Sequence, residues 1–129
     1  MSLRIARLGS PRAPREGVRL GTVRRPPRGV RKQDYSRLDY FDLWLPELAP
    51  SAPLVGFALS QPFTAKRWKS YAARYRREMR APSAERLIRL LALLSRHADF
   101  SVGCYCADES RCHRSLLREL LRRAGAKLA

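Results

Sequence analysis

The stretch DFSVGCYCADESRCHRSLL, residues 99–117, carries the clearest fold signal in the chain. Its first part, 99–106, is almost uninterruptedly apolar, which is typical of a strand buried on both faces, as in a parallel sheet. From Cys112 onward, leucines recur at spacings of three and four, which predicts a helix running to about Ala124. Gly125 is expected to end that helix.

Upstream of this stretch, the sequence predicts two further strands. They are expected at 3–9 and 18–23, and each leads into a turn rich in proline and glycine. Residues 31–65 are expected to be mostly loop, with one short helix near 39–48. The predicted order is two strands, then helices, then a strand and a final helix. This order is typical of an α/β domain.

Two long helices are predicted between these strands. Residues 65–80 place an aromatic stripe on one side and Lys and Arg on the other, and 82–98 begin with the helix-start pair Pro82 and Ser83. The buried face of the second helix is expected to contain Leu87, Leu90, Leu91 and Leu94. We therefore predict a single domain over 1–129, a compact three-layer α/β domain with a small, mostly parallel sheet flanked by helices.

The composition favours a folded, strongly basic protein. Apolar residues make up 45% of the 129, and 27 Lys and Arg against 11 Asp and Glu give a net charge of +16. Such a charge favours anionic partners: nucleic acid, nucleotides, phosphorylated metabolites or an acidic protein. The N-terminal sequence does not resemble a secretory signal, and no apolar run has membrane-spanning length. We expect a cytoplasmic location, no membrane partner and reduced cysteines.

The three cysteines, Cys104, Cys106 and Cys112, together with His113, could in principle bind zinc. Their spacing, however, differs from the two separated cysteine pairs of usual structural sites. On an extended strand, the α-carbons of Cys104 and Cys106 would also lie nearly 7 Å apart. The sequence therefore predicts no metal and no cofactor, and purified protein is expected to contain no stoichiometric zinc.

The predicted helix start at Cys112 is a candidate anion site at the carboxyl end of a strand. Arg111, Arg114 and Ser115 could add two cations and a hydroxyl to the free amides of the first helical turn. The same surroundings would favour the thiolate of Cys112, which makes it the candidate nucleophile. His113 is expected to point toward the sheet, as a hydrogen-bonded core residue or as an acid–base group.

Several motifs resemble the domain-of-unknown-function family 488, in its YeaO-like branch. They are CADESRCHRSLL (106–117), GVRLGTVRRPPRGVRK (17–32), LWLPELAPS (43–51) and WKSYAARYRREM (68–79). The positions that match the family's motifs are Arg24, Pro27, Arg28, Gly29, Trp44, Glu47, Leu48, Ala49, Pro50, Ser51, Trp68, Arg74, Tyr75, Glu78, Cys112, His113 and Arg114. Two positions depart from them: Val23 stands where the family commonly has Asp, and Pro26 where it has Trp. The resemblance implies a small α/β protein with a parallel sheet, and the family's activity is not established.

Three functions are compatible with these features. The first is a small enzyme or ligand-binding protein for an anionic, nucleotide-like molecule. If it is an enzyme, a cysteine thiol would carry the catalysis. Its cleft would be lined by Arg24, Arg28, Cys112, His113 and Arg114. The second is a nucleic-acid-binding module that uses the basic N-terminal segment and the 66–80 helix, and the third is a protein that only associates with a partner.

The direction of the arginine side chains discriminates between the first two functions. Arginines that converge on Cys112 would favour the enzyme or ligand-binding protein, whereas a flat basic face with exposed aromatic rings would favour the nucleic-acid-binding module. The sequence leaves the oligomeric state open.

Overall fold

The computed structural model describes every residue from Met1 to Ala129. Its centre is a four-stranded parallel sheet in the order β1-β4-β2-β3. The strands are β1 (Leu3–Arg7), β2 (Val18–Gly21), β3 (Leu43–Trp44) and β4 (Phe100–Cys104). All five residues of β4 are buried, as its apolar sequence predicts. The predicted α/β class and parallel sheet are confirmed.

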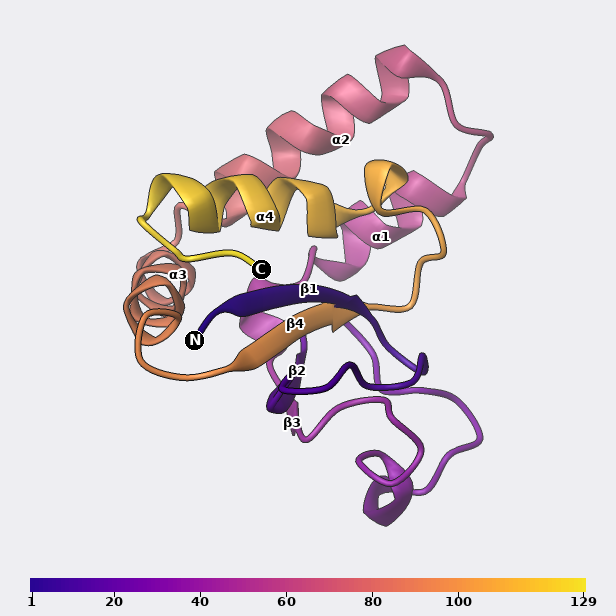
Figure 1. Ribbon diagram of the computed structural model, residues 1–129. Coiled ribbons are helices and arrows are strands. Elements are labelled where there is room, and N and C mark those ends of the chain that lie inside the picture. The colour runs from indigo at the N-terminus through magenta and orange to yellow at the C-terminus, as the bar shows by residue number, and fades with distance from the viewer.

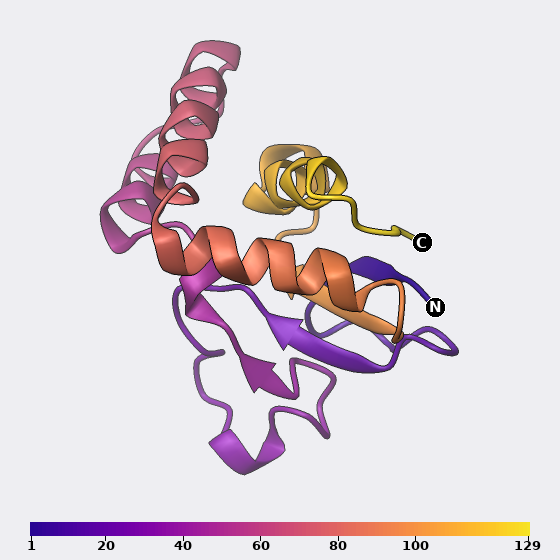
Figure 2. The ribbon, with the colours of Figure 1, turned by 90° about the vertical axis from the view of Figure 1, so that its left-hand side faces the viewer.

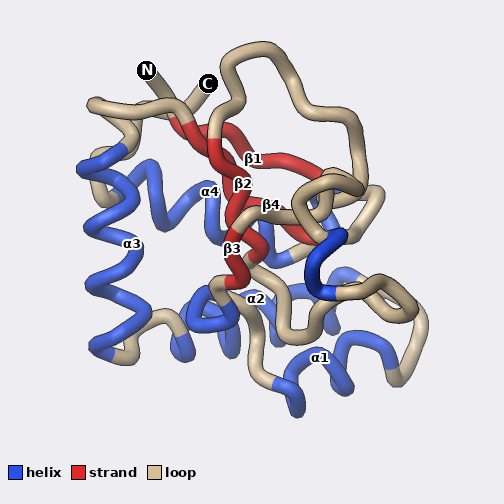
Figure 3. Tube along the Cα trace, turned by 90° about the horizontal axis from the view of Figure 1, so that it is seen from below, coloured by secondary structure: helices blue, strands red, loops and turns tan.

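Four α-helices surround this sheet. They are α1 (Ala52–Leu59), α2 (Ala65–Glu78), α3 (Pro82–Leu94) and α4 (His113–Arg123). Figures 1 and 2 show α2 and α4 on one side of the sheet. Seen from below, the strands cross the centre of the molecule between α3 and the long loops (Figure 3). Every helix is too short or too polar to cross a lipid bilayer.

Side-chain caps fix where α1 and α2 begin. The Ser51 hydroxyl accepts a hydrogen bond from the Leu54 amide at 3.3 Å, and the Thr64 hydroxyl accepts one from the Arg67 amide at 3.1 Å. The Ser51 amide also donates to the Glu78 carboxylate at 2.8 Å. Because Glu78 is the last residue of α2, this contact ties the start of α1 to the end of α2.

The helix predicted near 39–48 is wrong. Leu43 and Trp44 instead pair with β2 as the short strand β3, and Pro46–Leu48 form a 3₁₀ turn. The Trp44 indole N–H donates to the Val23 carbonyl oxygen at 2.7 Å, which fixes this edge strand. The loop expected over 31–65 is likewise interrupted by α1.

The face that α3 buries also differs from the prediction. Leu91 is buried, but the side chains of Leu90 and Leu94 are 47% and 40% exposed. The buried positions of this helix are Ala84, Ile88, Leu91 and Ala92. They recur at three- and four-residue spacing like the predicted set, so a helix with leucines on several sides leaves the buried face ambiguous.

Two apolar clusters form the core. The larger one lies between the sheet and the helices, and the smaller one consists of Leu8, Val23, Phe41, Cys104 and Cys112. Leu8 and Val23 follow β1 and β2, Cys104 ends β4 and Cys112 precedes α4. Phe41 precedes β3, and its ring lies against Gly21, the last residue of β2. In a parallel sheet the carboxyl ends of the strands share one edge, so this second cluster lies where such sheets place ligands.

Candidate functional site

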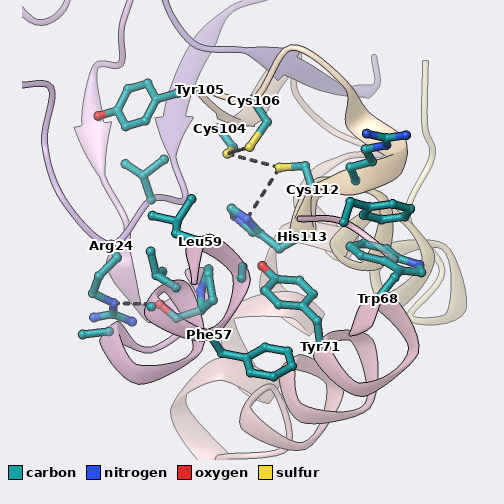
Figure 4. A pocket seen from close by; sticks show the side chains of 18 of the residues that line it. Arg24, Phe57, Leu59, Trp68, Tyr71, Cys104, Tyr105, Cys106, Cys112 and His113 are labelled. Carbon is teal, nitrogen blue, oxygen red and sulfur yellow. Dashed lines mark hydrogen bonds between the residues drawn. The ribbon is translucent and has the colours of Figure 1, made fainter. Parts of the chain in front are cut away.

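A cavity of about 700 Å³ opens at the carboxyl edge of the sheet. Its wall is built by the segment after β2, by α1, by the first half of α2 and by the residues between β4 and α4 (Figure 4). Five arginines line it, and no Asp or Glu does. These arginines are Arg24, Arg25, Arg28, Arg67 and Arg111.

The three cysteines meet at one side of this cavity. The Cys112 thiol donates to the Cys104 sulfur at 3.2 Å, and the Cys104 thiol donates to the Cys106 sulfur at 3.6 Å. All three sulfurs lie within 4.8 Å of one another. The extended geometry expected over 99–106 ends at Cys104, and the following turn brings Cys106 back toward it. The wide separation of Cys104 and Cys106 that was expected on an extended strand, and that argued against a metal site, is therefore not observed.

His113 is the first residue of α4 and is only 4% exposed. Its Nε2 lies 2.6 Å from the Thr22 carbonyl oxygen, which can only accept, so Nε2 carries the ring hydrogen. Nδ1 is then an unprotonated nitrogen 3.7 Å from the Cys112 sulfur. Burial lowers the pKa of His113 to about 4, so the ring is neutral near pH 7. The expected sheet-facing orientation is confirmed.

The acidity of the three thiols differs from the sequence-based expectation. Hydrogen bonds from Cys104 and Cys112 lower the pKa of Cys106, the exposed thiol of the three. A hydrogen bond with Cys104 favours the thiolate of Cys112, but its contact with Cys106 and its burial outweigh this and raise the pKa of Cys112. Cys112 is the residue directly before α4, one position from the predicted helix start, and Cys106 is the more acidic thiol. The catalytic roles of Cys112 and His113 stay predictions.

Three of the arginines predicted to bind a ligand do line the cavity: Arg24, Arg28 and Arg111. The guanidinium of Arg24, however, donates to the carbonyl oxygens of Pro46, Ala49 and Pro50 and is committed to holding that turn. Arg28 is exposed and forms no ion pair. Arg111 stacks 4.3 Å from the centre of the Phe63 ring and has an exposed ion pair, at 3.6 Å, with Asp108.

Arg114 and Ser115 do not line the cavity. Arg114 is 4% exposed, and one of its terminal nitrogens donates to the Cys106 carbonyl oxygen at 2.6 Å. Its Nε is buried without a hydrogen-bond partner, and no carboxylate pairs with it. The Ser115 hydroxyl donates to the Cys112 carbonyl oxygen at 3.0 Å. Both residues therefore support the cysteine loop from behind.

Two aromatic side chains of α2, Trp68 and Tyr71, form the opposite wall of the cavity. Trp68 is half-buried and stacks on Tyr71, with the ring centres 5.4 Å apart. In Figure 4 the Tyr71 hydroxyl points toward His113. The sequence reasoning also missed Arg25, an exposed neighbour of Arg28, and the part of α1 that lines the cavity. The Ser51 and Pro53 start signal could have revealed α1.

Thiol labelling of reduced, chelator-treated native protein is expected to modify Cys106 first. Cys104 and Cys112 are 6% and 2% exposed, so a reagent reaches them only when the structure opens. Peptide mapping after short reaction times identifies the labelled residue. In the Cys106→Ser variant, rapid labelling should disappear. Labelling of Cys112 as fast as Cys106 in the unsubstituted protein would contradict this arrangement.

Comparison with known proteins gives a family match over nearly the whole chain. The family model described as the active DUF488-N3 subclade matches residues 3–125. No curated protein and no solved structure matches the chain. The matched range includes all four strands and all four helices, and with them the cavity and its cysteines.

Proposed function

The chain belongs to the DUF488 family, as its motifs predicted, and from that premise we propose that it binds an anionic ligand with a planar ring. A nucleotide is the ligand class that fits these requirements best. The binding place is the cavity at the carboxyl edge of the sheet. The observation that carries the proposal is a wall that combines arginines with aromatic rings and contains no carboxylate.

The anionic part of the ligand is assigned to the arginines at the rim. Arg25 and Arg28 are exposed and hold no intramolecular ion pair, and Arg111 shares the rim with them. A phosphate bound there would meet guanidinium groups that match its oxygens with paired N–H donors. These cations are more accessible to a ligand than the first amides of α4, because Cys112, His113 and Arg114 at the start of that helix are buried.

The ring of the ligand is assigned to the aromatic wall. Trp68 and Phe63 are the accessible rings of this wall, with their centres 6.3 Å apart, and the buried Tyr71 stacks on Trp68 at 5.4 Å. A volume of about 700 Å³ lies within the usual range for small-molecule sites. Cys106 lines the same cavity and is the exposed cysteine of the three.

A nucleic-acid-binding module remains the second candidate, because α2 carries a basic face outside the cavity. Its exposed cations are Lys66, Lys69, Arg76, Arg77 and Arg80. Tyr71 and Tyr75 of this helix are buried, however, and Trp68 belongs to the cavity wall. The basic face therefore has no row of exposed rings for stacking bases, which favours the small-ligand function.

Calorimetric titration separates the two functions. A nucleoside monophosphate is expected to bind more tightly than the nucleoside or inorganic phosphate alone, since it uses both halves of the site. Trp68→Ala should weaken binding by about 1–3 kcal/mol, the usual loss when a stacked base loses its aromatic partner. Arg28→Glu should also weaken it, and more than Arg76→Glu, an equal charge reversal on α2 outside the cavity.

An oligonucleotide titrated in parallel completes the test. If Arg76→Glu reduces oligonucleotide binding and the mononucleotide does not bind the unsubstituted protein, the nucleic-acid function replaces the proposed one. Equal effects of Arg28→Glu and Arg76→Glu on the mononucleotide would show attraction by overall charge alone.

A further inference from the structure

We propose that Cys104, Cys106 and Cys112 bind a zinc ion at the side of the cavity. Three sulfurs converge there from the end of β4, the turn after it and the start of α4 (Figure 4). The inference uses only these residues and their surroundings, and does not rest on nucleotide binding.

The spacing of the sulfurs suits one shared ion. In a tetrahedral zinc site with Zn–S bonds of about 2.3 Å, neighbouring sulfurs lie about 3.8 Å apart. Cys104 is 3.6 Å from Cys106 and 3.2 Å from Cys112, and no pair exceeds 4.8 Å. The pairs at 3.2 and 3.6 Å are far longer than a disulfide bond, and thiolates are the ligands that zinc prefers among soft donors.

A buried cation beside the cluster supplies an independent argument. Arg114 is 4% exposed, has no carboxylate partner and keeps an unpartnered buried Nε. A buried charge without a counter-charge is costly. Zinc held by three thiolates carries a net charge of −1, which would balance the guanidinium of Arg114.

The surroundings of Cys112 also follow the pattern of a metal centre. His113 donates its Nε2–H to the Thr22 carbonyl oxygen, the contact that usually orients a histidine next to a metal. Its Nδ1 lies beside Cys112, 3.7 Å from the sulfur, but outside the three-sulfur group. Nδ1 carries no hydrogen that it could donate to a thiolate, and only the three sulfurs form a group close enough to share one ion, so we leave the fourth zinc position to water or to a ligand in the cavity. Three protein ligands and one open position are typical of catalytic rather than structural zinc sites.

Zinc content of the purified full-length protein tests this inference. Protein from zinc-supplemented cells is expected to contain one zinc per chain by elemental analysis. Cobalt substitution should give the absorption bands of tetrahedral cobalt with thiolate ligands. Cys106→Ser should lose the stoichiometric zinc. Because Cys106 is exposed, this variant is expected to fold, which circular dichroism checks, whereas the buried Cys112→Ser could fail for structural reasons.

A competition titration with a chromophoric chelator gives the second readout. His113→Ala is expected to keep one zinc per chain, because all three sulfur ligands remain. Substoichiometric zinc in the unsubstituted protein, or full zinc in folded Cys106→Ser, would overturn the site. Complete loss of zinc in folded His113→Ala would overturn the open fourth position, because His113 would then be a ligand. Nucleotide titration of metal-free protein reports on the cavity separately.

Discussion

Replacing Glu16 with Gln is expected to lower the free energy of unfolding by about 3–5 kcal/mol. Glu16 pairs with Arg19, whose side chain is 1% exposed, through contacts of 2.7 and 2.9 Å. The Ser101 hydroxyl also donates to Glu16 at 3.0 Å, so the pair links β2 to β4. The amide of Gln cannot neutralise the guanidinium, and Arg19 would remain as a buried, uncompensated charge. Urea titration measures the loss.

The same pair predicts a dependence on pH. Burial alone would raise the pKa of Glu16, but hydrogen bonds from Arg19, the Ala13 amide and Ser101 outweigh it and hold this pKa below its usual 4.5. Protonation therefore favours the unfolded chain. The stabilisation is fully present above the usual pKa and is lost as the pH falls through the folded pKa. The stability difference between the unsubstituted protein and Glu16→Gln should shrink in acid.

An exposed ion pair provides the matched control for Glu16. Glu119 pairs with Arg122 at 3.2 Å and with Arg123 at 3.4 Å on the surface of α4. Glu119→Gln is expected to cost about 1 kcal/mol or less, because exposed pairs contribute little. Equal losses for Glu16→Gln and Glu119→Gln would show that the buried pair has no special role.

Gly103→Ala is expected to destabilise the protein by about 1–3 kcal/mol, toward the upper end of that range. A β-carbon at Gly103 would lie 2.6 Å from the Ala6 carbonyl oxygen and 2.8 Å from the Leu8 side chain. The closest atom belongs to the backbone of β1, so relief requires β1 to move away from β4. The movement would also disturb Cys104, the next residue.

Gly56→Ala is the control for this substitution. A β-carbon at Gly56 meets no atom within 4 Å, and the position lies inside α1. Since alanine favours a helix interior over glycine by about 1 kcal/mol, this variant should gain stability. Thermal or urea unfolding of both variants gives the comparison. If Gly103→Ala were as stable as Gly56→Ala, the close approach of β1 and β4 would be wrong.

The sheet and the long helices could be predicted because their signals are local. The apolar run of β4 and the aromatic stripe of α2 are properties of short segments, and both are confirmed by their buried residues. The strand β3 has only two residues and forms because Trp44 reaches the Val23 carbonyl oxygen. That contact joins distant parts of the chain and leaves no periodic pattern.

The location of the candidate site could be predicted from the sequence, but the contacts within it could not, because they join segments that are distant in the chain. The loop between β4 and α4 was located correctly at the carboxyl end of a strand, and α4 begins at His113, one residue after the predicted start. Cys106 comes back toward Cys104 because the chain turns after β4. The prediction that 99–106 is extended throughout did not include this turn. The commitment of Arg24 to three carbonyl oxygens likewise depends on the fold of 46–50.

The fluorescence of Trp68 tests the central claim most directly. The chain has two tryptophans, and the emission of Trp68, which lies in the cavity wall, is the part of the signal that is missing in a Trp68→Phe variant. We predict that a nucleoside monophosphate quenches this emission saturably, and that Arg28→Glu shifts the midpoint to higher ligand concentration. Unchanged emission at concentrations where calorimetry detects binding would contradict the account, because the ligand would then bind away from the aromatic wall.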